Sequence, residues 1–277
     1  MIIQEQKETR KAWNKIAAGY AEFVTHGHEW LANEGFRRAD LRPGMRFLDV
    51  AAGCGALSIP AARLGAQVLA TDLSPVMLEQ LRARAQREGL KLETQVMDGQ
   101  ALELENDTFD VAASQFGVML FPDMPRGISE LARVTRPGGR VLMHVFGTAG
   151  KVEFFVFFVR AVQAAVPGFN GPPMDPPPLP FQLQDPDRLY QELARAGLKH
   201  IRVDTITEEL EYQSGMQLWN WLKNSNPIVE TVLEQVNLTK EQTGVVQQAL
   251  DDMIRDRAGE SGPAVLTVPI NIGVGTK

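Results

Sequence analysis

The chain is poor in the residues that several classes of protein depend on. Its 277 residues include one cysteine, Cys54, which excludes an internal disulfide and a cysteine-based zinc cluster, so we expect no metal. Basic residues are also scarce: 28 Lys and Arg against 34 Asp and Glu give a net charge of −6. Such a balance argues against nucleic acid as a partner.

Long apolar runs are missing as well. The most apolar stretch, VEFFVFFVRAVQAAV at 152–166, is shorter than the roughly 20 residues of a membrane span, and Glu153 and Arg160 interrupt it. The N-terminal MIIQEQKETRKAW carries charges where a signal peptide needs an apolar core. We therefore expect a cytoplasmic protein with no integral membrane segment.

Residues 45–146 alternate between short apolar strands and helical patterns, which is typical of a doubly wound α/β domain with a parallel sheet. Strands are predicted at Arg46–Ala51, Gln67–Asp72, Lys91–Val96, Phe109–Ser114 and Arg140–Val145, and helices at Ala56–Leu64, Pro75–Arg87 and Arg126–Thr135.

The flanking segments have other patterns. Helical spacing predicts helices over about 8–24 and 29–40, and eight prolines between 167 and 186 predict an extended loop. We divide the chain into an N-terminal helical lid, the core, a helix with the Pro-rich loop, a core helix and strand, a helical cap insertion, and a last core strand. The corresponding ranges are 1–44, 45–146, 147–190, 191–212, 213–262 and 263–277.

The loop FLDVAAGCGALS at 47–58 predicts a nucleotide-like ligand, because a strand leads into closely spaced glycines. A nucleoside triphosphate is excluded, since no Gly-Lys-Ser/Thr follows. A dinucleotide is harder to dismiss: Asp72 lies 17 residues beyond Gly55, a suitable interval for an acid that binds ribose. However, Ser58 stands where the third glycine belongs.

Asp49 favours a third ligand, S-adenosylmethionine. An acid beneath the loop would repel a pyrophosphate, whereas it suits a sulfonium and an α-amino group. Three ordered features support this choice: Asp98 in MDGQAL (97–102), the strand FDVAASQFGVMLFPD (109–123), and the helix, turn and strand of ELARVTRPGGRVLM (130–143).

This ordered set resembles the class I S-adenosylmethionine-dependent methyltransferases, the type that includes the ubiquinone/menaquinone-biosynthesis C-methyltransferases. The segments most similar to the sequence motifs of this family are LDVAAGCG (48–55), TDLSPVML (71–78) and ARVTRPGGRVLM (132–143). The resemblance implies a Rossmann-like, seven-stranded, mostly parallel sheet with helices on both faces. It also implies a helical cap built from the N-terminus and late insertions.

The resemblance assigns the first part of the cofactor site to the loop and the acid after it. The backbone of Ala51, Gly53 and Gly55 would pass close under S-adenosylmethionine, or under the product S-adenosylhomocysteine. Asp49 would hold the methionine amino group, directly or through water. Asp72 would accept hydrogen bonds from both ribose hydroxyls.

The second part of the implied site follows the later strands. Leu73 and Met77 would pack on the adenine, while Asp98 and the amide of Gly99 would bind its edge. The main chain at Ser114 would meet the methionine end of the cofactor.

Other candidates keep two interpretations each. Tyr20 either closes over the cofactor, as a tyrosine does in related enzymes, or lies on the apolar stripe of its helix and packs in the protein core. His144 ends the fifth strand on the ligand side and is a candidate base, with a structural role as the alternative. Cys54 is interpreted as a small residue in a tight loop.

The acceptor is predicted to be a small, largely apolar molecule, phenol-like, quinone-like or an amine. The motif of nucleic-acid N-methyltransferases is missing after the fourth strand. Aromatic and apolar side chains would form most of the acceptor pocket, with one polar residue: Phe116, Met119, Phe146 and Trp219, together with Gln115. The Phe-rich run at 152–166 would otherwise be an internal or homodimer helix. A fold that binds the cofactor without methylating, as a cyclase, decarboxylase or regulator, is the alternative function.

Overall fold

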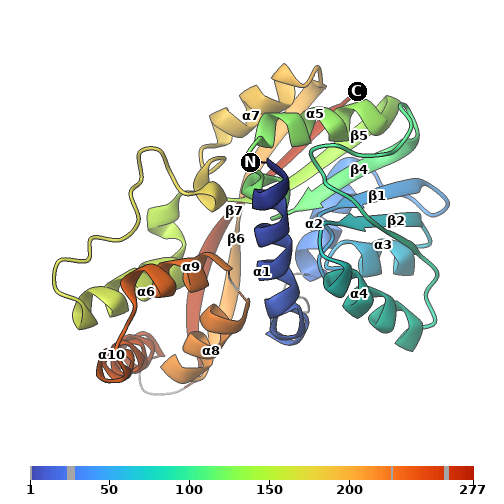
Figure 1. Cartoon of the computed structure of the whole chain (residues 1–277). Coiled ribbons are helices and arrows are strands. Elements are labelled where there is room, and N and C mark those ends of the chain that lie inside the picture. The colour runs from blue at the N-terminus through green and yellow to red at the C-terminus, as the bar shows by residue number, and fades with distance from the viewer. Residues whose placement is uncertain (1, 24–28, 226, 259–261) are drawn as a thin grey trace.

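The computed structural model describes residues 2–23, 29–225, 227–258 and 262–277. Seven strands form one sheet in the order β3-β2-β1-β4-β5-β7-β6 (Figure 1). All neighbouring pairs are parallel except those of β7, which runs antiparallel to β5 and β6. The strands are β1 (Arg46–Val50), β2 (Gln67–Asp72), β3 (Glu93–Val96), β4 (Phe109–Gln115), β5 (Thr135–Phe146), β6 (Lys199–Tyr212) and β7 (Ala264–Thr276). The predicted seven-stranded, mostly parallel sheet is confirmed.

Helices cover both faces of the sheet. On one face α2 (Glu29–Ala39) packs on β5 and β7, while α3 (Ser58–Leu64) and α4 (Pro75–Arg87) pack on β2. On the other face α5 (Met124–Val134) packs on β4 and β5, and α7 (Pro186–Arg195) packs on β6 and β7. Figure 1 shows these two helical layers on either side of the strands.

Local signals explain where these helices begin. The Ser74 hydroxyl accepts a hydrogen bond from the backbone N–H of Met77 at 3.1 Å, and Pro75 occupies the first turn of α4. Asp185 caps α7 in the same way, by accepting from the N–H of Asp187 at 2.9 Å.

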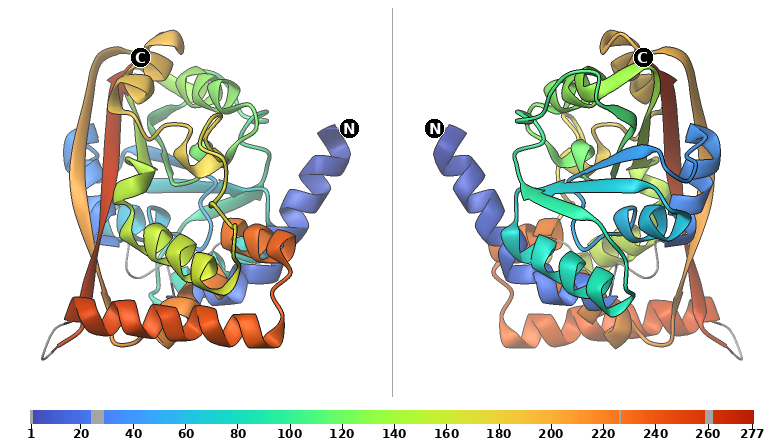
Figure 2. Two further views of the ribbon diagram at one scale, coloured as in Figure 1. Left: turned by 90° about the vertical axis from the view of Figure 1, so that its left-hand side faces the viewer. Right: turned by 90° about the vertical axis from the view of Figure 1, so that its right-hand side faces the viewer.

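A further group of helices lies beyond the carboxyl ends of the parallel strands. It consists of α1 (Ile2–Phe23), α6 (Glu153–Ala165), α8 (Gly215–Ser225), α9 (Pro227–Val236) and α10 (Lys240–Ala258). The last three are inserted between β6 and β7, and α10 lies across the lower ends of these long strands (Figure 2). α1 contacts α4, α8 and α9, so it joins this group to the core.

The predicted boundaries differ from the observed ones by a few residues. α1 begins at Ile2 instead of about residue 8, and β5 begins at Thr135 instead of Arg140. Between α6 and α7 the Pro-rich segment contains only one short 3₁₀ helix, η3 (Leu179–Phe181), because proline cannot donate backbone hydrogen bonds. Among the described residues, no helix combines the length and the apolar character that a membrane crossing requires.

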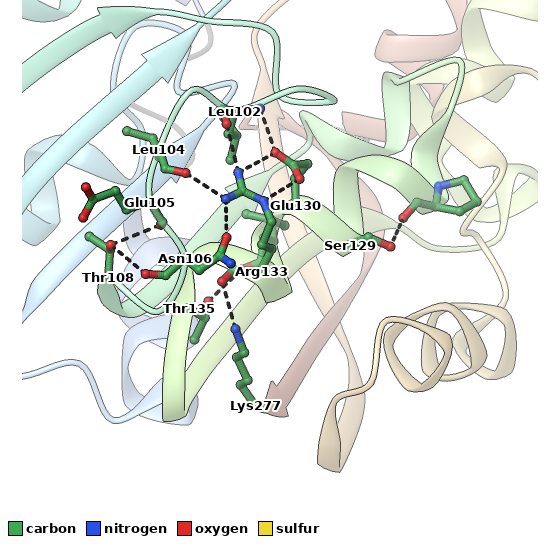
Figure 3. A network of polar contacts seen from close by, with 12 residues as sticks. Leu102, Leu104, Glu105, Asn106, Thr108, Ser129, Glu130, Arg133, Thr135 and Lys277 are labelled. Carbon is green, nitrogen blue, oxygen red and sulfur yellow. Dashed lines mark hydrogen bonds and ion pairs between the residues drawn. The ribbon is translucent and has the colours of Figure 1, made fainter.

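One arginine fixes the segment between β3 and β4. Arg133 of α5 binds Glu130 through Nε and Nη2 at 2.7 and 2.8 Å. Its guanidinium also donates to the carbonyls of Leu102 and Leu104 and to the Asn106 side chain (Figure 3). The whole donor set of the guanidinium is thus used to hold residues 102–106 against α5.

Candidate functional site

A cavity of about 510 Å³ opens at the carboxyl ends of β1, β2 and β4, beneath α1. This is the edge of a doubly wound sheet where ligands bind. The cavity is lined by Gln6, Thr9, Trp13, Tyr20, Ala51, Gly53, Asp72, Leu73, Met77, Met97, Asp98, Gly99, Gln100, Ala101, Gln115, Phe116, Gly117, Leu120, Phe121, Pro122, Asp123 and Arg126.

The loop after β1 presents its backbone to this cavity. Ala51 and Gly53 both have positive φ, 57° and 53°, a conformation that is unusual for alanine. Gly55 does not line the cavity: a Cβ there would collide with Leu81, so this glycine allows the loop to pack on α4. The sequence suggested a ligand contact for all three residues, and the structure gives Gly55 a packing role.

Asp72 is fixed at the end of β2 with its carboxylate facing the loop. Its Oδ2 accepts from the N–H of Gly53 and its Oδ1 from the N–H of Ser74, both at 2.8 Å. The side chain is buried yet lines the cavity, and burial raises its pKa to about 6. An anchored carboxylate at this place is suited to accept hydrogen bonds from a ligand's hydroxyl groups.

Asp49 lies behind the loop and does not line the cavity. Its Oδ2 accepts a hydrogen bond from the Ser58 hydroxyl at 2.6 Å. Burial raises the pKa of Asp49 to about 7, and the nearby Asp72 adds to the rise. Ser58 occupies the place of the third glycine of a dinucleotide loop. Its hydroxyl donates to Asp49, the acid that favours S-adenosylmethionine over a dinucleotide as the ligand.

Asp98 and Gly99 line the cavity after β3. The Asp98 carboxylate accepts from the N–H of Gln100 at 2.9 Å and from Nε2 of Gln6 at 2.5 Å. A Cβ on Gly99 would lie 2.5 Å from the Phe121 ring, so only glycine lets that ring approach the cavity wall. Gln6 thereby connects α1 to the same acid that was predicted to bind adenine.

α1 supplies one wall of the cavity, which the sequence analysis largely missed. Gln6, Thr9, Trp13 and Tyr20 face the cavity, and Trp13 and Tyr20 pack edge to face with ring centroids 5.9 Å apart. Their spacing of three, four and seven residues is a single helical stripe. That stripe was available in the sequence, but only Tyr20 was assigned to the site from it.

At the turn after β4, two of the predicted residues line the cavity and a third is buried in the core. Ser114 is buried, with its hydroxyl donating to the Val50 carbonyl at 2.8 Å and accepting from the N–H of Val118. Gln115 and Phe116 line the cavity, and Phe116 has a positive φ of 57°. Strained residues of this kind cluster at functional sites.

His144 lies one strand away from the cavity, and its side chain contacts the lining residue Gln115. The two residues are register partners in β4 and β5, and Gln115 Oε1 lies 2.7 Å from His144 Nδ1. His144 is 1% exposed and packs beneath Gly35 of α2, where a Cβ would collide with its ring. It therefore contacts a cavity residue rather than the cavity.

Three residues predicted for the acceptor pocket lie outside the cavity. Met119 is buried in the core, and Phe146 stacks behind Phe116 with ring centroids 4.7 Å apart. Trp219 lines a separate hollow that Lys15, Gly19 and residues of α8 and α9 also border. The many aromatic residues of these segments predicted a pocket, but their rings mostly pack on one another. The Pro-rich residues 167–186 do not line the cavity either.

Comparison with known proteins shows which proteins this chain is similar to. Residues 47–139 match a family model described as a methyltransferase domain. The chain is 48% identical over 103 residues to an uncharacterized protein of Mycobacterium tuberculosis, covering 37% of this chain and 38% of that one. It is 35% identical over 135 residues to a demethylmenaquinone methyltransferase of Streptomyces avermitilis, covering 47% and 55%. The match thus spans about half or less of the curated relatives.

Solved structures show the same fold over most of the chain. The YcgJ protein of Bacillus subtilis superposes with a TM-score of 0.57 at 16% identity, covering 91% of this chain and 98% of that one. Phosphoethanolamine N-methyltransferase 2 of Haemonchus contortus, in complex with S-adenosyl-L-methionine, gives 0.55 at 19% identity, covering 91% and 56%. The resemblance inferred from the motifs is confirmed.

Proposed function

We propose that the chain transfers a methyl group to a small, largely apolar acceptor. Residues 47–139 match the family model of a methyltransferase domain, and the chain resembles the class I S-adenosylmethionine-dependent methyltransferases. The observation that carries the proposal is the cavity in which Asp72 and Asp98 face the stripe of α1. Bound S-adenosylmethionine would supply an electrophilic methyl group on a sulfonium, a good leaving group.

The residues of the cavity fit that cofactor. Asp72 is held by two backbone N–H groups, which leave carboxylate lone pairs to accept from ribose hydroxyls. Asp49 lies behind the loop and does not line the cavity, so its negative charge would stabilise a cationic amino group through water. A Cβ on Gly53 would sit 3.6 Å from the Tyr20 ring and so would narrow the space between loop and helix.

The protein's part in transfer is positioning and exclusion of water. Trp13 and Tyr20 cover the cavity from α1, and Phe116 borders it from the turn after β4. Holding the acceptor in line with the methyl group lowers the entropic part of the barrier, and a dry site strengthens each polar contact. Gln115 is the polar side chain at that turn that we assign to orienting the acceptor.

The apolar nature of the proposed acceptor rests on the lining of the cavity. Phe116, Leu120 and Phe121 contribute apolar surface to the cavity. Within the described residues, Arg126 is the sole basic side chain that lines the cavity. A phenol, quinone or amine with one reactive atom suits these walls better than a polyanion.

The cofactor is tested by calorimetry with S-adenosylhomocysteine and with NAD. S-adenosylhomocysteine is expected to bind and NAD is not. Asp72→Ala should weaken binding by about 1.5–3 kcal/mol for each charged hydrogen bond lost, whereas Asp252→Ala, an exposed acid on α10, should not change it. Binding of NAD without S-adenosylhomocysteine would overturn the assignment.

The reaction is tested with methyl-labelled S-adenosylmethionine and a panel of phenols, quinones, amines and carboxylic acids. Label in an apolar phenol, quinone or amine supports the proposal. Label only in polar anionic acceptors contradicts the proposed acceptor class. Tight cofactor binding with cyclisation or decarboxylation of a panel member, and no transferred label, would replace the methyl transfer with the non-methylating function.

A further inference from the structure

A second cleft lies on the face of the sheet that α2 covers, away from the proposed methyl-transfer site. Its volume is about 430 Å³. The cleft is lined by Arg37, Arg38, Arg140, His200, Arg202, Asp204, Ile272, Val274 and Thr276. Arg140 pairs with the first residues of β4 and Arg202 follows the start of β6, so the cleft sits toward the amino ends of the parallel strands. The cofactor cavity is at the opposite ends.

Strand β7, which lies between β5 and β6, forms the floor of this cleft. Ile272, Val274 and Thr276 alternate along β7 and therefore share one face of the sheet. In the register, Arg140 of β5 lies opposite Thr276, and Arg202 of β6 lies opposite Val274. Since paired residues in a sheet point to the same face, the two arginines flank the floor from both sides.

The end of α2 forms the third wall, and its geometry is fixed. Arg38 binds Asp204 through Nε at 2.9 Å and Glu34 through Nη1 at 2.6 Å, which joins α2 to β6 across the cleft. Arg37 binds Glu34 as well and is otherwise exposed. These pairs hold two guanidinium groups at the rim before any ligand is present.

Arg140 and Arg202 are the cations that remain for a ligand. Neither makes an ion pair within the residues that the structure describes, and Arg140 donates only to the carbonyl of Gly138. The cleft contains four arginines and one acid although the whole chain has a net charge of −6. Glu34 pairs with Arg37 and Arg38, and Asp40 lies near enough to Arg140 for the arginine to lower its pKa. The guanidinium groups that line the cleft still outnumber its one lining acid, which favours a bound anion.

We propose that this cleft binds a small phosphate monoester, with the phosphate between Arg140 and Arg202 and an apolar body on the β7 floor. Guanidinium groups bind phosphate oxygens in pairs, which gives geometric specificity as well as attraction. Ile272 and Val274, both nearly buried, form a narrow apolar strip on which a small apolar body would rest. The negative net charge of the chain disfavours a long polyanion such as nucleic acid.

The test is calorimetry of phenyl phosphate with the full chain at low salt, in the presence of saturating S-adenosylhomocysteine to occupy the other cavity. Phenyl phosphate is expected to bind more tightly than inorganic phosphate, and phenol is expected not to bind. Arg140→Ala and Arg202→Ala should each weaken phenyl phosphate by about tenfold or more. The matched control is Arg255→Ala, an exposed arginine on α10, which should bind as the unaltered chain does.

Several outcomes overturn the proposal. One is a lack of heat with phenyl phosphate, and another is equal binding by the Arg140→Ala and Arg202→Ala chains while their thermal unfolding is unchanged. Competition by S-adenosylhomocysteine would assign the phosphate to the first cavity instead. Vesicles containing phosphatidic acid distinguish the source of the group: binding to them that needs Arg140 and Arg202 identifies a lipid headgroup as the phosphate monoester.

Discussion

The side chains of Gln115 and His144 meet across the neighbouring strands β4 and β5, with Oε1 and Nδ1 2.7 Å apart. Gln115 lines the cavity, whereas His144 is enclosed between the sheet and α2. We therefore propose that the histidine positions the Gln115 amide and does not act as a base in contact with an acceptor. Two substitutions separate these roles.

Gln115→Ala should lower the turnover of methyl transfer by about 10²-fold, because a misplaced acceptor loses alignment with the methyl group. His144→Asn should lower turnover less, since a residue that acts through another loses only part of the alignment. Cofactor affinity should stay unchanged in both. Steady-state kinetics with calorimetry checks this, and an equal loss of cofactor binding would contradict it.

The buried acids predict how stability depends on pH. Burial raises the pKa of Asp49 to about 7 and of Asp72 to about 6, while both ionise near pH 4 in the unfolded chain. Between these values the folded protein retains protons that the unfolded chain has released. The stabilisation is complete below about pH 4 and is lost as the pH rises through about 6 to 7.

Asp49→Asn should flatten this dependence, because the amide does not titrate. Urea unfolding at several pH values between 4 and 8 measures the difference in slope between the two chains. Taking the difference cancels contributions from acids such as Glu130, whose pKa is lowered by Arg133 and which act in the opposite direction. Identical slopes would show that Asp49 titrates normally in the fold.

Arg133 should be the most sensitive arginine of the core to substitution. Arg133→Ala removes bonds to Glu130 and to the Leu102 and Leu104 carbonyls, and hydrogen bonds to charged groups contribute about 1.5–3 kcal/mol each. We expect the free energy of unfolding to fall by about 2 kcal/mol or more. Arg133→Lys should restore only part of the lost free energy of unfolding, because an ammonium group cannot donate the paired hydrogen bonds of a guanidinium.

The control for this prediction is Arg136→Ala. Arg136 binds Asp110 at the surface, with half of its side chain exposed, and such pairs contribute about 0–1 kcal/mol. Urea unfolding measures both variants. A loss at Arg133 no larger than at Arg136 would show that the network in Figure 3 does not stabilise the fold.

Trp13 should report cofactor binding by its fluorescence. It is the tryptophan that lines the cavity, while Trp219 lines another hollow and Trp221 packs edge to face on Phe154 at 4.9 Å. Addition of S-adenosylhomocysteine should change the emission of the unaltered chain, and Trp13→Phe should remove most of that change. A response that persists in Trp13→Phe and disappears in Trp219→Phe would place the cofactor elsewhere.

The sequence predicted the core of the fold because its signals there are local. Strand alternation, helical spacing and the acids at strand ends depend on neighbouring residues, so each could be recognised without tertiary contacts. β2 and α4 were predicted with the observed boundaries. Asp72 and Asp98 were likewise placed in the cavity by their positions after β2 and β3.

The acceptor side was less predictable because burial is a tertiary property. Phe146 and Met119 are as apolar as Phe116, yet only Phe116 lines the cavity, since its positive φ turns the chain after β4. The contribution of Gln6, Thr9 and Trp13 to the cavity was missed because it depends on where α1 docks. Polar residues on a helix indicate a solvent-facing side unless the docking of that helix is known.

The strand order has a consequence for synthesis of the chain. β7 is made after β6 but lies between β5 and β6, so neither older strand has its final neighbour until Ala264–Thr276 has left the ribosome. Until then β5 ends the parallel sheet with an unpaired edge, and β6 has no partner at all. Edges of this kind promote association with other chains. How much of the chain escapes aggregation would then depend on the proteins that bind it during synthesis, rather than on the stability of the folded protein.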